Sequence, residues 1–153
     1  MSAFRLPRLD RISGADWRLL AEALPTLAWA SLAIALLPFK RVAATASQPD
    51  RAAPRPDGAA PRKIAWAVNA WARRVPWRAV CFQRGLAAHR MLRRRGYASI
   101  LHYGVAQEAD AGVKAHVWVS VDGQAVIGGE EAPKFACLAT FPAGADCPSV
   151  TKG

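Results

Sequence analysis

The stretch that decides the fold class is CFQRGLAAHRMLRRRGYASILHYGV, residues 81–105. In its first half, small and apolar residues recur every three or four positions from Cys81 onward, which predicts a helix over residues 81–95. Gly96 suits the left-handed conformation that commonly ends a helix. The period then changes, and residues 98–105 have the composition of a strand. A helix that leads through a glycine into a strand indicates an α+β protein.

Further strands are predicted downstream. Residues 115–121, AHVWVSV, alternate between valine and other side chains, so successive residues point to opposite faces of a sheet. The dipeptide Asp122-Gly123 that follows is a strong signal for a two-residue hairpin turn. Residues 124–129 then form the return strand, and residues 134–140 are a candidate for one more. The sheet is therefore expected to be small and antiparallel.

The N-terminal part reads as helical. Ser13 is suited to cap a helix over residues 14–24, and Pro25 opens a second helix or kinks the first. A Pro-, Ala- and Arg-rich stretch over residues 45–62 indicates a linker or long loop, and a helix is predicted over residues 63–74. The expected organisation is an N-terminal helical segment (1–44), the linker (45–62), an α/β core (63–141) and a disordered tail (142–153).

One apolar segment, residues 24–39, raises the question of membrane contact. It has 16 residues, short of the ~20 that a transmembrane helix needs. A buried helix or helical hairpin is the favoured interpretation. An interfacial anchor, with Trp17, Trp29 and flanking basic residues at the headgroup level, is the alternative, and a transmembrane helix is the least favoured.

The amino-acid composition indicates the cellular location of the protein and the chemical class of its partners. The 153-residue chain carries a formal net charge of +10, which favours acidic partners. Its three cysteines, at irregular spacing, give poor support for a disulfide framework, and the absence of a Cys-x-x-Cys pair argues against structural zinc. Without a secretory signal, a reducing cytoplasm is the expected location. No cofactor is expected from these features.

Cys81 has two interpretations: an apolar filler, or a nucleophile whose thiolate is stabilised by the helix N-terminus. A nucleophile needs a base, and three histidines are available. His89 lies on the same helix about 12 Å away along the axis, which is too far. His102 lies in a predicted strand, and nothing else recommends it. His116 projects from the strand over residues 115–121, on the face opposite the valines, and is the preferred candidate.

The segment 81–105 and the strand AHVWVSVDGQAVIGG together resemble the transglutaminase-like leader peptidases of lasso-peptide gene clusters. That family shows a Cys-Leu-x-Arg-(Ala/Gly)-Leu helix start, a basic helix end before glycine, and an Ala-His-Ala-Trp-Val strand. The resemblance covers roughly residues 64–141. It implies a reduced papain-like or transglutaminase-like core and a cysteine peptidase that removes the leader from a lasso precursor.

The resemblance also implies roles for individual residues. Cys81 is then the nucleophile and His116 the general base. The family's third member is an aspartate, but glycines at positions 128 and 129 occupy its expected place, and Glu130 is the preferred substitute. A backbone carbonyl or a water are the other candidates. The substrate-binding residues implied or suggested by position are Trp77, Arg84 and Trp118.

The implied partners are the lasso precursor, a separate leader-recognition protein and a cyclase resembling asparagine synthetase. Because the sequence contains no phosphate-binding glycine loop, any need for ATP would come through the cyclase. Three alternatives stay open: a basic binding module for nucleic acid or membrane, a catalytically inactive relative with a scaffolding role, and another acyl-transfer enzyme on the same fold. The scattered arginines and the lack of a stacking platform argue against nucleic acid.

Overall fold

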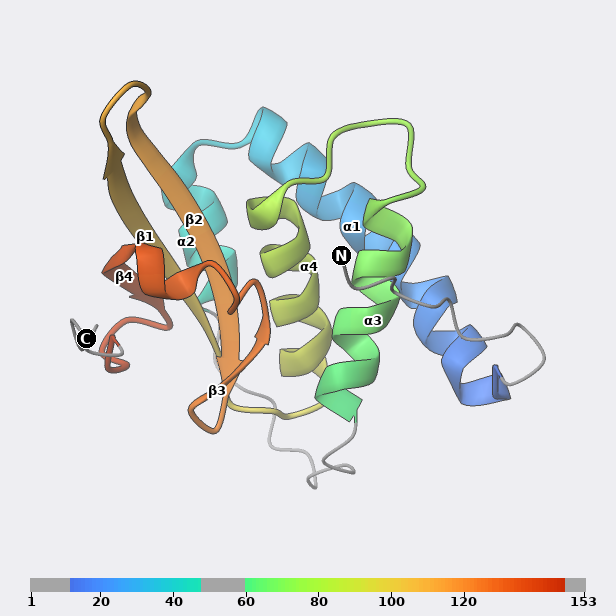
Figure 1. Cartoon of the computed structure of the whole chain (residues 1–153). Coiled ribbons are helices and arrows are strands. Elements are labelled where there is room, and N and C mark those ends of the chain that lie inside the picture. The colour runs from blue at the N-terminus through green and yellow to red at the C-terminus, as the bar shows by residue number, and fades with distance from the viewer. Residues whose placement is uncertain (1–11, 48–59, 148–153) are drawn as a thin grey trace.

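The computed structural model describes residues 12–47 and 60–147 as helices packed on one small sheet. In chain order the elements are α1 (Gly14–Leu36), α2 (Phe39–Ala46), α3 (Ala60–Ala72), α4 (Cys81–Arg94), β1 (Ser99–Glu108), β2 (Gly112–Val121), β3 (Gln124–Ile127), the 3-10 helix η2 (Ala132–Lys134) and β4 (Ala136–Phe141). Helix α4 lies between the sheet and the pair α1 and α3 (Figure 1). The predicted α+β class is confirmed.

Helix α1 is longer than the sequence pattern suggests. Ser13 caps it as expected, through a reciprocal hydrogen-bonded box with Asp16. The helix then continues through Pro25 to Leu36. Of the two alternatives that the sequence left open, Pro25 therefore lies within the first helix and does not open a second one. Burial of one face of α1 against α3 and α4 outweighs the hydrogen bond that proline removes. Pro38 precedes α2, a short helix that the sequence pattern did not separate from the apolar segment.

Three contacts attach α1 to the helices beneath it. Arg95, just after α4, donates to both carboxylate oxygens of Glu22, and its Nη1 lies 3.0 Å from Oε1. The guanidinium of Arg90 lies 4.1 Å from the ring centre of Trp29. The indole of Trp71, on α3, donates to a backbone carbonyl of α1. Two residues of the basic end of α4, Arg94 and Arg95, thus pair with Glu22, and Arg94 also remains exposed.

One hydrophobic core connects the N-terminal helices with the sheet. Its buried members include residues of α1, α2, α3, α4, β1, β2 and β3. Helix α2 extends to Ala46 and α3 begins at Ala60, so both ends of the expected linker belong to helices. Linker residues 48–59 and tail residues 148–153 lie outside the described residues, and the suggested domain boundaries stay predictions.

The sheet is antiparallel throughout, in the order β3-β2-β1-β4. The predicted hairpin turn between β2 and β3 is confirmed, because Asp122 and Gly123 both have positive φ, 51° and 78°. Strands β1 and β2 are longer than expected and pair along their whole lengths, from Ser99 with Val121 to Glu108 with Gly112. Strand β3 is shorter, ending at Ile127.

Helix α4 packs on β2 through one close approach. A Cβ atom at Gly85 would lie 2.7 Å from Cγ1 of Val117 and 3.6 Å from Cδ1 of Leu101. Gly85 thus removes the side chain that would hold the helix away from the strands. The contact also identifies the face of the sheet that α4 covers: it is the face formed by Val117, Val119 and Leu101, all buried in the core.

Two of the three cysteines form a disulfide, which the irregular cysteine spacing gave little reason to expect. Cys137, in β4, is joined to Cys147. The bond ties the segment after β4 back to the sheet. Cys81 is left as the free cysteine.

We expect Gly85→Ala to destabilise the protein, although alanine favours helices by about 1 kcal/mol over glycine. Overpacking against Val117 costs about 1–3 kcal/mol and opposes that gain. Urea unfolding of Gly85→Ala, Val117→Ala and the double variant measures the coupling. We expect the double variant to be more stable than the sum of the single changes predicts, by about 1 kcal/mol. If Gly85→Ala instead stabilises the protein by the full helix-propensity difference of about 1 kcal/mol, the close contact with Val117 is contradicted.

Candidate functional site

Cys81 is the first residue of α4. Val80 is the N-cap residue of the helix. It has an extended conformation, and no side chain caps the helix N-terminus. The thiol is free and half-buried. Backbone N–H groups in the first turn of a helix lack partners within the helix and carry partial positive charge. An oxyanion formed next to Cys81 would therefore lie within reach of these backbone N–H groups.

An aromatic cluster flanks the cysteine. Phe82 lies 6.2 Å from Phe39, the first residue of α2, between ring centres. Phe39 in turn lies 5.8 Å from Tyr103 on β1 and 6.1 Å from Phe141 on β4. These rings fix the start of α4 against α2 and the sheet, so the surroundings of Cys81 on this side are apolar.

The other residues expected near Cys81 make structural contacts. Arg84 reaches α3, where its Nη1 donates to Oδ1 of Asn69 at 3.3 Å, and its Nε is buried without a partner among the described residues. Trp77 is 38% exposed, and its indole donates to the hydroxyl of Ser31 on α1 at 3.0 Å. Gln83, two residues after the cysteine, is half-buried, and its buried Oε1 has no partner among the described residues.

His116 lies on β2, opposite Gly104 of β1. Its Nε2 lies 2.8 Å from the backbone carbonyl of Gly128. Because a carbonyl only accepts, the proton of this bond sits on Nε2. The ring packs 4.9 Å from Phe135 and 6.0 Å from Trp118, between ring centres. The imidazole is thus held by a backbone group and two aromatic side chains.

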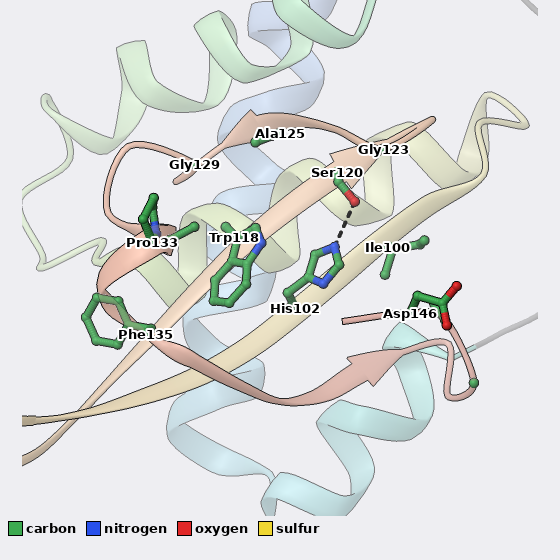
Figure 2. A pocket seen from close by; sticks show the side chains of 13 residues that line it. Ile100, His102, Trp118, Ser120, Gly123, Ala125, Gly129, Pro133, Phe135 and Asp146 are labelled. Atoms are coloured by element: carbon green, nitrogen blue, oxygen red, sulfur yellow. Dashed lines mark hydrogen bonds between the residues drawn. The ribbon is translucent and has the colours of Figure 1, made fainter. Parts of the chain in front are cut away.

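Cys81 and His116 lie on opposite sides of β2. The helix that carries Cys81 covers the Val117 face, whereas His116 shares its face with Trp118 and Ser120 because side chains alternate along a strand. Figure 2 shows Trp118 and Ser120 on the side of the sheet turned away from the helices. The sequence placed both residues in the right elements, and the structure does not bring them into contact.

The expected third group is also differently arranged. Glu130 is exposed and forms no hydrogen bond or ion pair within the part of the chain described, and Glu131 pairs with Lys134 at 3.1 Å. The group bonded to His116 is the Gly128 carbonyl, one of the alternatives that the sequence left open. Gly128 has φ of 76°, and a Cβ there would lie 2.7 Å from the carbonyl oxygen of Val117. A carboxylate side chain is therefore excluded from this position by both conformation and space.

Trp118 belongs to a second group of side chains on the outer face. Its ring stacks parallel to that of His102, with 5.2 Å between centres, and both residues are 3% exposed. Nε2 of His102 lies 2.7 Å from the hydroxyl of Ser120 (Figure 2). Burial lowers the pKa of His102, which favours the neutral ring. Sequence analysis missed this pairing, although strand parity placed His116, Trp118 and Ser120 on one face.

His89 is a buried structural residue. Nδ1 lies 2.8 Å from the hydroxyl of Ser99, and Nε2 lies 2.8 Å from the carbonyl of Ala46. It thus connects α4 with β1 and α2. Desolvation lowers the pKa of His89 to about 4, only partly opposed by the bond to Ala46. Its expected exclusion from catalysis agrees with these contacts.

Comparison with known proteins assigns the fold to a family. The model of the transglutaminase-like superfamily matches residues 23–140, more than half of the chain. No curated protein and no solved structure matches the chain.

We expect His89 to make the protein less stable in acid. An unfolded His89 binds a proton below pH 6.5, whereas the folded ring binds one only near pH 4. Proton binding therefore favours the unfolded chain as the pH falls from about 6.5 to about 4, by about 3 kcal/mol in total. Urea unfolding at several pH values should show this loss in the wild-type protein. The His89→Gln protein should be less stable than the wild-type protein at neutral pH, and it should lose less stability in acid. An unchanged pH dependence would refute the assignment of this loss to His89.

Proposed function

Because the chain belongs to the transglutaminase-like superfamily, we propose that it is a cysteine peptidase that removes the leader from a lasso-peptide precursor. The superfamily includes cysteine peptidases and acyltransferases. The observation that carries the proposal is the position of Cys81: a free, partly exposed thiol at the first residue of the helix that packs on the sheet. The narrower assignment to lasso leaders rests on the resemblance of residues 81–105 and the AHVWV strand.

In the proposed reaction, Cys81 Sγ attacks the carbonyl carbon of the scissile peptide bond. The backbone N–H of Cys81, at the positive end of α4, donates to the oxyanion that forms. The C–N bond then breaks, the core peptide leaves through its new N-terminal amine, which takes up a proton, and the leader remains bound to Cys81 as a thioester. Water hydrolyses the thioester and restores the thiol. The apolar cluster around Phe39 and Phe82 provides a wall against which substrate side chains can pack.

His116 is proposed as the base that takes the thiol proton and later gives it to the leaving amine. To do so, its ring must leave the Gly128 carbonyl and turn around the edge of β2. Two features support such a movement. The described pairing of β2 with β3 stops at Val119 with Ile127, three residues beyond His116. Two glycines, Gly128 and Gly129, directly follow β3 and allow the covering segment to change conformation.

The partners proposed for this reaction are a separate leader-recognition protein and an asparagine-synthetase-like cyclase. They follow from the family resemblance. Any nucleotide requirement would then lie with the cyclase.

Incubation of the protein and its recognition partner with a candidate precursor, followed by mass spectrometry, tests the proposal. We expect loss of the leader mass, abolished by Cys81→Ala and slowed about 10²–10⁴-fold by His116→Ala. Gly128→Ala should also slow cleavage, because its Cβ would displace the strand next to His116.

Matched controls separate catalysis from folding. Asp110→Asn, in the exposed hairpin, should cleave like the wild-type protein. Circular dichroism should show that the Cys81 and His116 variants remain folded. Leader loss that persists in folded Cys81→Ala would refute the cysteine mechanism, and loss that depends on Cys81 but not on His116 would remove His116 as the base.

A second candidate function is a catalytically silent scaffold for the same partners. The separation of His116 from the Cys81 side of β2 favours it. This candidate predicts that the protein binds the recognition protein or the cyclase, that no leader is lost, and that Cys81→Ala leaves binding unchanged. Cleavage by the wild-type protein eliminates it.

We further propose that the C-terminal end of α1 contacts a membrane surface peripherally. Helix α1 is the one described helix long and apolar enough to cross a membrane, but its buried face packs in the core. Leu32 and Leu36, one turn apart, are 59% and 75% exposed, and the exposed Lys40 and Arg41 follow them. Apolar side chains beside basic ones are typical of interfacial contact with anionic lipid.

Sedimentation with phosphatidylglycerol vesicles and with phosphatidylcholine vesicles tests this contact. We expect preferential binding to the anionic vesicles, reduced about ten-fold or more in Leu32→Asn/Leu36→Asn, because each leucine loses about 1–2 kcal/mol of burial. Val113→Asn/Leu138→Asn, which alters two other exposed apolar residues, is the matched control. Equal sedimentation of both double variants would contradict a contact through α1.

A further inference from the structure

An open pocket of about 780 Å³ lies on the face of the sheet turned away from the helices (Figure 2). Its floor is formed by residues of β1 and β2 that share this face, and the segments around Pro133 and Ala145 form its walls. Cys81 and His116 are not among its lining residues. The volume falls within the range of about 300–1,000 Å³ typical of small-molecule sites. The pocket is therefore large enough for a ligand. It borders the proposed base, because its lining residues Trp118 and Phe135 pack against the ring of His116.

The pocket has an apolar lining with flat rings. Trp118 and Phe135 are both almost fully buried yet line the cavity, together with Ile100 and Pro133. Trp118 is fixed in place, because it stacks on His102 and because a Cβ at Gly104 would lie 2.8 Å from its ring. Rigid aromatic walls favour a flat, apolar ligand, since little side-chain freedom is lost on binding.

His102 lines the pocket and has one buried ring nitrogen without a hydrogen-bond partner among the described residues. Its Nε2 is engaged by Ser120, whereas Nδ1 is buried without a partner among the described residues. If Nε2 donates its proton to the serine hydroxyl, Nδ1 is an acceptor. An unpaired buried acceptor costs free energy, and a ligand donor recovers that cost by displacing the atoms that cover Nδ1. A ligand with an N–H group meets this requirement.

Asp146 supplies the charge. It is the carboxylate among the lining residues, and no lysine or arginine lines the pocket. Asp146 is exposed at the rim, and it is the charged side chain among the lining residues. A ligand that carries a positive charge is therefore favoured here over an anion.

From these features we propose that the outer pocket binds a small arylalkylamine, an aromatic ring that carries a protonated amine on a short alkyl chain. The ring packs against Trp118 and Phe135, an N–H donor reaches the imidazole of His102, and the ammonium group lies next to the carboxylate of Asp146. The site depends on neither Cys81 nor the proposed peptidase activity, so its test stands apart from the cleavage experiment.

Two probes that share the indole ring and the two-carbon chain but end in opposite charges test the proposal: tryptamine, with an ammonium group, and indole-3-propionate, with a carboxylate. Titration of ¹⁵N-labelled protein, followed by NMR, reports both affinity and location. We expect tryptamine to shift the signals of Trp118 and Ser120 and to bind at least about ten-fold more tightly than indole-3-propionate. Asp146→Asn should weaken tryptamine binding about three- to ten-fold and leave the anionic probe no weaker.

Asp110→Asn is the control, because it removes the same charge from the exposed hairpin between β1 and β2. It should bind tryptamine like the wild-type protein. The proposal is overturned if tryptamine leaves Trp118 and Ser120 unshifted up to about 10 mM, a concentration at which even weak ligands register. It is equally overturned if the two probes bind alike, or if Asp146→Asn binds tryptamine as the wild-type protein does.

Discussion

The close approach of α4 to β2 at Gly85 and Val117 determines how every functional side chain is arranged. The glycine brings the helix backbone next to the strand, and the strand's period of two then assigns each of its residues to one side or the other. Val117 and Val119 face the helix and the core, whereas His116, Trp118 and Ser120 face outward. A shift of the strand by one residue would exchange the two sets.

This division gives the molecule two chemically different sides. On the helical side, Cys81 lies at the start of α4 among aromatic residues, with the partial positive charge of the helix N-terminus beside it. On the outer side, the rings of His102, Trp118 and His116 follow one another across the sheet and are covered by the segments after β3 and β4. In the proposed peptidase, the His116 ring moves between the two sides at the edge of β2. In the structure, the carbonyl of Gly128 holds this ring on the outer side.

The N-terminal helices are part of the structure that supports the site. Glu22 of α1 binds Arg95 at the end of α4, and His89 within α4 bonds to the end of α2 and to β1. These buried or half-buried polar contacts connect segments that are far apart in the sequence. They hold α4, and therefore Cys81, in a fixed position relative to the sheet.

Local patterns in the sequence were sufficient to predict several structural features. The Ser13 cap, the start of α4 at Cys81, the Gly96 helix end and the Asp122-Gly123 turn all depend on the conformational preferences of a few adjacent residues, and the structure contains each of them. The alternation of residues 115–121 also assigned the valines and His116 to opposite faces correctly. The passage of α1 through Pro25 was not predictable in this way, because packing against α3 and α4 overrides the local preference.

What the sequence by itself determined is therefore the α+β class, most of the element starts and turns, and which side chains of β2 share a face. Only the tertiary structure decided which of those faces the cysteine-bearing helix covers, that a glycine carbonyl rather than a carboxylate binds His116, and that His102 pairs with Ser120. The physical reason is that the apolar valine face is buried against α4 by the hydrophobic effect, which acts between segments distant in the chain, whereas turns and caps are decided by neighbours.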